Sequence, residues 1–275
     1  MNILRAGVIG WPIEHSKSPL MHGYWLKKLG VRGEYVKIAA APDAFEARVR
    51  ELARDGWRGL NVTIPHKEAA LRLADEASET ALAIGAANTL VFQSDGKIHA
   101  DNTDGFGFTE NLIDRAGATW RRDQPAAIYG AGGAARAIIH ALVGAGAAEV
   151  RLLNRTRSRA EDLANVFGPK VKTIEWGDDA TALSGAGLIV NTTSLGMVGQ
   201  PPLEIDFSIA PSHAVATDIV YTPLETPFLR DAARVGLAIV DGLGMLIHQG
   251  RPGFEAWFGK RPSADAALRE LLLNS

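Results

Sequence analysis

The sequence predicts an α/β protein made of two domains, each built on a mostly parallel sheet. Short apolar runs such as RAGVIG, EYVKIA and GLNVT alternate with amphipathic stretches in the first hundred residues, and this alternation is typical of βαβ units. A second series of the same kind begins near Gln124. The length of 275 residues fits either one large domain or two ordinary ones, because single domains usually have about 100–200 residues.

The first series predicts three strands, each followed by a helix. The runs at 5–10, 34–39 and 59–63 are the expected strands, and the stretches at 19–30, 43–56 and 65–77 are the expected helices. Two further apolar runs, NTLVFQ and KIHA, flank Ser94-Asp95-Gly96. Asp-Gly between apolar runs predicts a hairpin, so we expect the first sheet to carry an antiparallel edge.

The second series predicts a separate doubly wound unit of the Rossmann type. Its expected strands are AAIYG, EVRLLN, LIVNTTS, AVATDIV and LAIVDG, with a Gly/Ala-rich helix after the first and a helix from Ser158 after the second. The Ser158–Glu161 spacing matches a capping box. The helical spacing of 104–122 predicts a linking helix, and three helical stretches are expected after Gly242. We therefore expect one domain at 1–104, completed by 246–275, and the other at 105–245.

Composition limits the classes of function. A formal charge of −2 provides no basic field for nucleic acid. The absence of cysteine rules out disulfides, thiolate zinc sites and a cysteine nucleophile, and the seven scattered histidines indicate no metal site. The apolar stretches at the start and at 137–148 are too short for a signal peptide or a membrane span. We expect a soluble, cytoplasmic protein that acts on small molecules.

A glycine-rich turn predicts a dinucleotide site. The stretch Gly130-Ala131-Gly132-Gly133-Ala134-Ala135 follows an expected strand and opens an expected helix. Backbone N–H groups at such a helix N-terminus bind pyrophosphate. The GxGxxA pattern alone could reflect only close packing of helix on strand, but its position between a strand and a helix favours the phosphate site.

The end of the next strand favours NADP over NAD. An NAD site places an acid about 20 residues after the glycine turn, where it bonds the ribose hydroxyl. Here the strand ends in Asn154-Arg155-Thr156, with Arg157 and Arg159 following. Guanidinium groups bind a 2′-phosphate well, although a solvated basic helix end is the alternative reading.

Tyr24 and Lys28 match the YxxxK pattern of short-chain dehydrogenases. In that class the pair follows the glycine turn, whereas here it precedes Gly130 by about a hundred residues. We therefore interpret the two residues as one face of an ordinary helix.

The stretch NVTIPHK places a lysine where helices usually lack one. A cation in the first turn of a helix is disfavoured by a few tenths to about 1 kcal/mol, so Lys67 requires a reason. Asn61 and Thr63 are two residues apart in the preceding strand and face the same side. Although Thr63 could simply cap the helix, the three side chains together indicate a small polar pocket.

Three more motifs have both a structural and a functional reading. Ser18 could be an N-cap before Pro19, and the stretch 101–105 could be a helix start capped by an aspartate. The stretch 101–105 fails as a calcium loop, because Thr103 and Gly105 stand where oxygen ligands are needed. Met245 and Gln249 are four apart and share a helix face, for which ordinary packing is sufficient.

Together these stretches resemble the shikimate dehydrogenase family over nearly the whole chain. The resemblance rests on GWPIEHSKSP, NVTIPHK, GAANTL, DNTDG, GAGGAAR, NRT, DIVYTPLETP and GLGMLIHQG, in that order. It implies a two-domain enzyme that uses NADP to interconvert 3-dehydroshikimate and shikimate, with its active site in the cleft and family members that are monomers or homodimers.

The resemblance also implies residue roles. Lys67 and Asp104 match the acid–base pair. A ketone that receives hydride gains negative charge and then a proton on oxygen, so a lysine can serve as both cation and acid there. Substrate-binding positions are matched by Ser16, Ser18, Asn61, Thr63, Asn88, Tyr221 and Gln249. Cofactor-binding positions are matched by Glu79, Gly130, Ala131, Gly132, Gly133, Ala134, Asn154, Arg155, Thr156, Arg159, Ile219, Gly242 and Met245.

Two alternatives stay open at this point. A quinate/shikimate dehydrogenase with relaxed cofactor use shares the motifs, although the basic NRT stretch disfavours NAD. A noncatalytic protein could keep the fold and bind the same ligands, but the presence of both Lys67 and Asp104 disfavours it. His66 stands where relatives can carry an aromatic residue, so its contribution to the pocket stays open.

Overall fold

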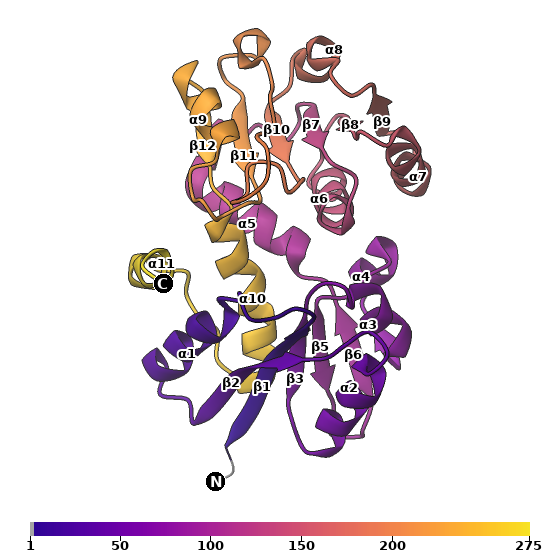
Figure 1. The fold of residues 1–275 in the computed structure, drawn as a ribbon, viewed down its shortest axis with the longest axis vertical. Helices are drawn as coiled ribbons and strands as arrows, with labels where there is room; N and C mark the ends of the chain where they lie inside the picture. The colour runs from indigo at the N-terminus through magenta and orange to yellow at the C-terminus, as the bar shows by residue number, and fades with distance from the viewer. Residues whose placement is uncertain (1–2) are drawn as a thin grey trace. The chain divides into compact units, whose positions relative to one another are not determined.

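The computed structural model describes residues 3–275, which divide into two compact units. The first unit contains residues 3–104 and 247–275, and the second contains residues 105–246. The chain passes between them within helices α5 (Asp104–Ala116) and α10 (Leu243–Phe258). Figure 1 labels the elements in chain order. Both units are α/β with mostly parallel sheets, which confirms the predicted fold class.

The sheet of the first unit has six strands in the order β2-β1-β3-β5-β6-β4. Its elements are β1 (Leu4–Gly10), α1 (Ser18–Lys28), β2 (Gly33–Ala39), α2 (Phe45–Arg54), β3 (Gly59–Val62), α3 (Lys67–Leu73), β4 (Glu76–Ala77), α4 (Glu79–Ile84), β5 (Thr89–Phe92), β6 (Ile98–Asp101) and the C-terminal α11 (Ala266–Leu273). Strand β5 runs antiparallel to both of its neighbours, and the other pairs are parallel. The predicted hairpin is therefore present, but β4 occupies the edge beyond it.

Strand β4 corrects the predicted helix at 65–77. Helix α3 ends at Leu73, and Ala74 adopts extended φ/ψ of −72° and 144°. The N–H of Asp75 then donates to Ile98 O, and Glu76 pairs with His99 on β6. Pairing with a strand distant in sequence overrides the local helical pattern.

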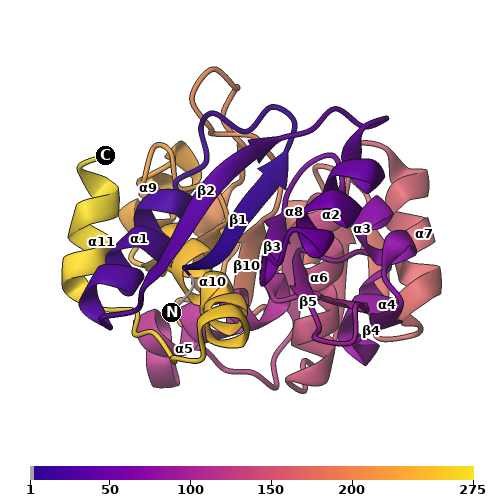
Figure 2. The same ribbon diagram turned by 90° about the horizontal axis from the view of Figure 1, so that it is seen from below.

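Helices cover both faces of the first sheet. Helices α2 and α3 pack their buried side chains, such as Phe45 and Leu73, against Leu60 and Leu90 of the strands. An aromatic cluster of Trp25, Phe254 and Trp257 comes from α1 and α10. Helix α11 runs beside α1 (Figures 1 and 2).

Two side chains of α1 form hydrogen bonds to the start of α11. The Tyr24 hydroxyl and the Lys28 amine each donate to Asp265 over 2.8 Å. Asp265 is the N-cap of α11, where it accepts from the N–H of Leu268. The YxxxK pair is therefore structural, as interpreted from the sequence.

The second sheet is all parallel, with the order β12-β11-β10-β7-β8-β9. Its elements are β7 (Ala126–Tyr129), α6 (Gly133–Gly144), β8 (Val150–Leu153), α7 (Arg157–Phe167), β9 (Val171–Ile174), α8 (Asp179–Leu183), β10 (Leu188–Asn191), β11 (Val215–Asp218), α9 (Pro227–Arg234) and β12 (Ala238–Val240). Numbered within the unit this is 6-5-4-1-2-3, the Rossmann order, whose switch point lies between β7 and β10. The sequence did not predict β9.

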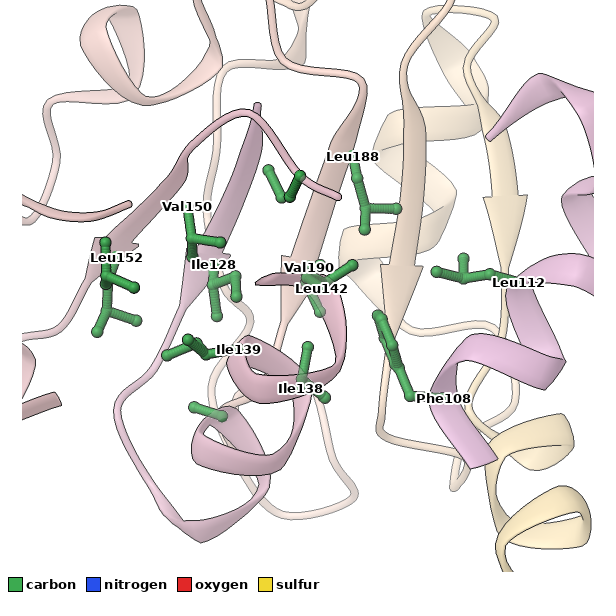
Figure 3. Packing of buried hydrophobic residues seen from close by; sticks show 14 of the residues in the cluster. Phe108, Leu112, Ile128, Ile138, Ile139, Leu142, Val150, Leu152, Leu188 and Val190 are labelled. Carbon is green, nitrogen blue, oxygen red and sulfur yellow. The ribbon is translucent and has the colours of Figure 1, made fainter. Parts of the chain in front are cut away.

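The core of the second unit forms where α6 packs on the sheet. Ile138, Ile139 and Leu142 point from the helix toward Ile128 and Val190 on the strands (Figure 3). All five are at most 1 % exposed. Truncating such a residue to Ala costs about 2–5 kcal/mol, so this layer holds the glycine turn before α6 firmly in place.

Three further helix ends differ from the predictions. Helix α7 begins at Arg157 with Thr156 as N-cap, so the Ser158–Glu161 capping box is wrong, and Glu161 instead pairs with Arg157. Ser18 is not an N-cap: it is the first residue of α1, and Lys17 precedes it without a side-chain cap.

The third difference is at the C-terminal end of the chain. Helix α10 continues through Pro252, so the part of the chain after Gly242 contains two helices, not three. A proline inside a helix removes one backbone hydrogen bond. Trp257 and Phe254 are anchored in the core on the far side of Pro252, and this burial offsets the loss.

Candidate active site

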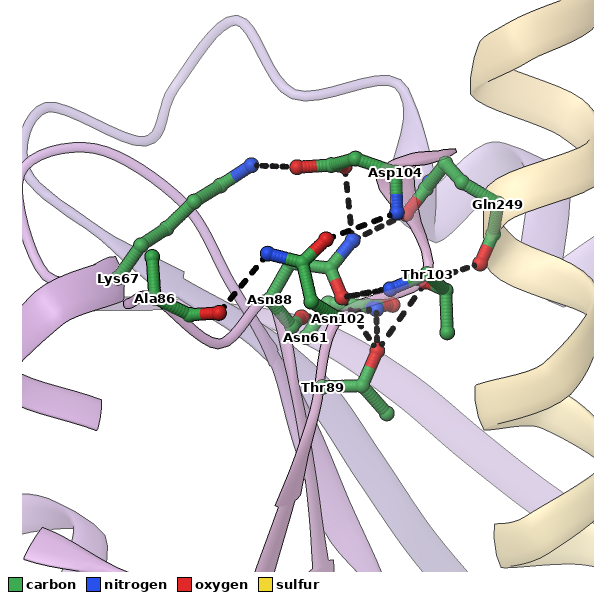
Figure 4. A network of polar contacts seen from close by, with 9 residues as sticks. All are labelled: Asn61, Lys67, Ala86, Asn88, Thr89, Asn102, Thr103, Asp104 and Gln249. Carbon is green, nitrogen blue, oxygen red and sulfur yellow. Dashed lines mark hydrogen bonds and ion pairs between the residues drawn. The ribbon is translucent and has the colours of Figure 1, made fainter. Parts of the chain in front are cut away.

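A polar cluster forms in the first unit where β5 enters the sheet. Because β5 is antiparallel to both neighbours, its beginning meets the ends of β3 and β6. Asn88 stands at this point: its carbonyl accepts from the N–H of Val62, and its N–H donates to Asp101 O. The topology thus brings together Asn61, Asn88 and Asp104, which come from three separate segments (Figure 4).

Lys67 and Asp104 form an ion pair in this cluster. Lys67 Nζ lies 2.5 Å from Asp104 Oδ2, and the side chains are 27 % and 11 % exposed. Lys67 lies in the first turn of α3, as the sequence predicted, although the helix begins at Lys67 and not at Pro65. The carboxylate offsets the unfavourable helix dipole at this position. The amine therefore remains partly open to solvent while its direction is held.

Asn88 orients the carboxylate of this pair. Its Nδ2 donates to Asp104 Oδ1 over 2.8 Å and to Gln249 Oε1 over 3.3 Å. Its Oδ1 accepts from the N–H of Thr103 over 2.9 Å and from the Thr89 hydroxyl over 3.0 Å. Both ends of the amide are engaged, so its orientation is defined by its neighbours.

The start of α5 is fixed by a separate contact. Asn102 Oδ1 accepts from the backbone N–H of Asp104, and Asn102 Nδ2 donates to Ala86 O. Asn102 thus supplies the cap, which leaves the Asp104 side chain to Lys67 and Asn88. The predicted aspartate cap in the stretch 101–105 is therefore wrong, because an asparagine takes that role.

Sequence reasoning missed two threonines of the cluster. The Thr103 hydroxyl donates to Gln249 O over 2.8 Å, which ties helix α10 to the cluster. Thr89 is 2 % exposed and accepts from Asn61 Nδ2. Thr103 lies inside the DNTDG motif, so its place in that polar motif was the available signal. No such signal marks Thr89 except its place beside Asn88.

Three hydroxyl groups lie at or near this end of the first sheet. Ser16 Oγ accepts from the N–H of Ser18 over 3.3 Å. Among residues 3–275, the hydroxyls of Ser18 and Thr63 have no hydrogen-bond partner. Thr63 does not cap α3, whose N-cap is His66. Ser18 and Thr63 are thus available to a ligand.

His66 anchors the segment that precedes Lys67. Its ring stacks on Phe45 with centroids 4.3 Å apart, and Nε2 lies 2.8 Å from Ala40 O. Since a carbonyl only accepts, Nε2 carries the proton. The ring is 2 % exposed, so its packing in the core fixes the start of α3.

The second unit presents the predicted glycine turn. Gly130 has φ of +109°, and a Cβ there would lie 2.7 Å from Thr192 Oγ1. A Cβ on Gly132 or Gly133 would meet nothing within 4 Å, so the N-terminus of α6 is open. Gly130 follows β7 and Thr192 follows β10, which places the turn at the switch point. These features fit a dinucleotide pyrophosphate.

Asn154 joins this turn to the basic segment after β8. Its Oδ1 accepts from the N–H of Ala131 over 3.1 Å, and its Nδ2 donates to Thr156 O over 2.8 Å. Ala134 lies in the first turn of α6, partly buried beside these residues. The two predicted parts of the cofactor site are thus adjacent.

The three arginines of the basic segment have different surroundings. Arg157 pairs with Glu161 over 2.8 Å and with Glu175 over 2.5 Å. Within residues 3–275, the guanidinium groups of Arg155 and Arg159 form no ion pair, and both are exposed. Their charge remains available for a phosphate, and no acid stands at the end of β8.

Ile219, Gly242 and Met245 also lie near one another in the second unit. A Cβ on Gly242 would lie 2.4 Å from Ile219 O, so the glycine allows this close approach. Met245 is 9 % exposed in a core cluster against which Ile219 packs. Burial raises the pKa of the Tyr221 hydroxyl, which follows β11 in the same unit. That hydroxyl is therefore a neutral donor.

Glu79 has surroundings unlike those of the other predicted cofactor residues. It is the exposed first residue of α4 in the first unit, after the N-cap Ser78. A carboxylate at this position is favoured by the helix dipole, which is a sufficient structural reason for it. Within residues 3–275 no group of three metal-binding side chains occurs, and no helix is long and apolar enough to cross a bilayer.

The Rossmann unit with its phosphate turn and the paired lysine and carboxylate define a nicotinamide-dependent oxidoreductase. Family models match three parts of the chain: the shikimate dehydrogenase substrate binding domain at 8–90, shikimate/quinate 5-dehydrogenase at 114–197, and the shikimate 5′-dehydrogenase C-terminal domain at 242–272. The chain belongs to the shikimate dehydrogenase family.

Individual relatives agree over the full length. The chain is 54 % identical to the shikimate dehydrogenase (NADP(+)) of Rhodospirillum rubrum, over 98 % of this chain and 96 % of that protein. It is 51 % identical to that of Paracoccus denitrificans, over 98 % and 95 %. The Thermus thermophilus enzyme, solved with NADP(H) and shikimate, superposes with a TM-score of 0.89 at 38 % identity, covering 99 % of each chain. Quinate dehydrogenase from Corynebacterium glutamicum, solved with NAD, gives 0.91 at 29 % identity, again covering 99 % of each.

Proposed function

We propose that this protein catalyses the reversible NADP-dependent reduction of 3-dehydroshikimate to shikimate, a step toward chorismate and the aromatic amino acids. The observation that carries the proposal is the Lys67–Asp104 ion pair of 2.5 Å, oriented by Asn88 and partly open to solvent. Membership of the shikimate dehydrogenase family supports it. We assign substrate binding to the first unit and NADP binding to the second.

Lys67 acts as the proton donor in reduction. Negative charge develops on the carbonyl oxygen as the ketone is reduced, and a cation that can release a proton stabilises that charge. The Lys67 amine transfers one proton to this oxygen, which gives the hydroxyl of shikimate. The Lys67 side chain is 27 % exposed, so solvent can return the proton to the amine. In the reverse direction Lys67 accepts the hydroxyl proton.

Asp104 and Asn88 position Lys67. Asp104 Oδ2 holds the amine, while Oδ1 is held by Asn88 Nδ2. This arrangement leaves the carboxylate with few other orientations, which is what a preorganised acid requires. The long bond of 3.3 Å from Asn88 to Gln249 is the one that a substrate hydroxyl would replace.

The remaining polar groups bind the substrate. The hydroxyls of Ser16 and Ser18 donate to its carboxylate, and Ser18 is suited to this because its hydroxyl has no partner within residues 3–275. Thr63, Asn61 and Gln249 bond the ring hydroxyls. Neutral donors can hold a carboxylate without the desolvation cost of a second buried charge.

NADP is held by the glycine turn and the basic segment of the second unit. The N–H groups at the start of α6 bind the pyrophosphate, and Arg155, Thr156 and Arg159 bind the 2′-phosphate. Ile219, Gly242 and Met245 line the nicotinamide. The bound cofactor supplies the hydride in reduction and accepts it in oxidation.

The decisive experiment measures NADPH formation by the purified protein with shikimate and NADP⁺. We expect activity in the wild-type protein and a loss of about 10²–10⁴-fold in kcat for Lys67→Met, with the substrate KM changed only a few fold. Lys97→Met is the matched control, because Lys97 pairs with Glu76 over 2.6 Å on the exposed hairpin of the same unit. A Lys67→Met protein that retains more than about a tenth of wild-type kcat would contradict the assignment.

The same assay separates the two alternatives. Quinate as substrate, or NAD⁺ as an equally good cofactor, would favour the quinate/shikimate dehydrogenase reading that the NAD-bound relative represents. The available charge of Arg155 and Arg159 disfavours it. Binding of shikimate without turnover would favour the noncatalytic reading. We propose a monomer or a homodimer, and a cytoplasmic location for this biosynthetic step.

A further inference from the structure

Tyr35 is a buried phenol that contacts one of the proposed substrate-binding residues. It lies in β2 and its Oη donates to Asn61 Oδ1 over 2.6 Å. The side chain is 7 % exposed. Burial raises the pKa of the phenol well above its ordinary value, so the hydroxyl keeps its proton and can donate.

The ring of Tyr35 has little freedom. His22 stacks on it in parallel, with centroids 3.8 Å apart and an interplanar angle of 5°, and Trp257 lies 6.0 Å away. Tyr35 is paired with Ala6 on β1, while Asn61 of β3 is paired with Val8 on the same strand. Because Ala6 is small, the phenol can extend across β1 to reach the amide.

The bond from Tyr35 determines which way the Asn61 amide faces. With Oδ1 occupied by the phenol, Nδ2 is directed to Asn88 O at 3.3 Å and Thr89 Oγ1 at 3.4 Å. Both distances exceed the usual 2.9–3.0 Å of an N–H···O bond. The amino group is therefore placed beside the Asn88 cluster with only weak partners (Figure 4).

We propose that Tyr35 is a positioning residue for the substrate: by donating to Asn61 Oδ1 it makes Asn61 present N–H donors to an oxygen of the substrate ring. This inference rests on the proposed function and adds a residue that does not itself touch the substrate. If the amide turned over, its oxygen would face Asn88 O, and two acceptors would oppose each other. The phenol thus selects a hydroxyl oxygen as the group recognised at this point.

The test compares Tyr35→Phe with Tyr24→Phe. The first variant keeps the ring stacked on His22 and removes the donor to Asn61. The second removes a hydroxyl of the same unit that bonds Asp265 over 2.8 Å. We expect Tyr35→Phe to raise the KM for shikimate about tenfold and to leave the KM for NADP⁺ within about twofold. Tyr24→Phe should change neither KM, even if both variants melt at lower temperature.

A second pair of substrates sharpens the test. Deoxyshikimates that lack the 4- or the 5-hydroxyl remove one candidate partner of Asn61 at a time. For the analogue without the recognised hydroxyl, wild-type and Tyr35→Phe proteins should have kcat/KM values within about twofold of each other. This analogue forms no hydrogen bond to Asn61 that the substitution could remove. If Tyr35→Phe lowers kcat/KM by the same factor with shikimate and with both analogues, Tyr35 serves only the fold.

The remaining outcomes are equally decisive. A Tyr35→Phe protein that melts like the wild type and has an unchanged shikimate KM would overturn the inference alone, since the wild-type activity would stand. An inactive wild-type protein would overturn the proposed function and the inference together. If Tyr35→Phe does not fold, Asn61→Asp replaces it: the carboxylate keeps the bond from Tyr35 but cannot donate. Its shikimate KM should rise at least about tenfold, and an unchanged KM would overturn the inference.

Discussion

His22 should make the stability of this protein fall on mild acidification. The ring is 0 % exposed in the aromatic cluster, and both of its nitrogens lack hydrogen-bond partners within residues 3–275. Burial lowers the pKa of His22 from 6.5 to about 3. The folded protein therefore keeps the ring neutral, whereas the unfolded chain binds a proton as the pH falls through 6.5.

The magnitude follows from this difference in pKa. Above about pH 6.5 neither state binds the proton, so His22 has no effect on the pH dependence. Below it, the free energy of unfolding falls by about 1.4 kcal/mol per pH unit until the folded pKa near 3 is reached. Between about pH 7.5 and about pH 5 the loss from this residue should be about 2 kcal/mol.

The assay is urea unfolding of wild-type and His22→Phe proteins at these two pH values. The quantity of interest is the change with pH in the stability difference between the two proteins, because packing costs and other titrating groups cancel in it. His15→Phe, which removes an exposed ring, is the matched control. A change below about 0.5 kcal/mol for His22→Phe would refute the reasoning, and an equal change for both variants would show that the burial of His22 is not its cause.

The other predictions concern binding and packing. Arg155→Ala and Arg159→Ala should each raise the KM for NADP⁺ by tens of fold, because a bond between charged groups is worth about 1.5–3 kcal/mol, while the KM for NAD⁺ barely changes. Arg157→Ala, whose guanidinium is already paired with Glu161 and Glu175, should change neither, and equal effects from all three variants would contradict the assignment. Ser18→Ala should raise the shikimate KM with little change in melting temperature. Ser16→Ala should raise the shikimate KM and also lower the melting temperature, because Ser16 Oγ accepts from the N–H of Ser18. A lower melting temperature for Ser18→Ala alone would contradict this assignment. Gly59→Ala should destabilise the first unit by about 1–3 kcal/mol or more in denaturant titrations, since its Cβ would lie 2.1 Å from both Leu90 O and Trp257 Nε1, and an unchanged midpoint would show that β3 can shift.

Local patterns were sufficient for much of the architecture. The alternation of apolar and amphipathic stretches predicted the α/β class, the Asp-Gly turn predicted the β5–β6 hairpin, and the glycine turn was placed correctly between β7 and α6. These features depend on residues close together in sequence: side-chain periodicity, a turn that needs glycine, and a helix with Lys67 in its first turn. Such short-range requirements can be recognised without knowing the fold.

What the sequence could not decide depends on residues far apart in the chain. For example, Arg157 forms an ion pair with Glu175, which lies beyond α7. The sequence alone does not show which arginine of the basic segment is paired in this way. Strand β4 replaced the end of a predicted helix because β6 offered backbone partners, and α10 continues through Pro252 because the aromatic residues beyond it are buried. In each case a local preference of about 1–3 kcal/mol is opposed by a free energy of burial or pairing of similar size. The free energy of burial or pairing exists only once the chain has folded. For the same reason, only the family resemblance singled out Asn88, and nothing in the sequence singled out Tyr35. Asn88 gains its partners where β5 meets β3, and Tyr35 gains its partner across β1.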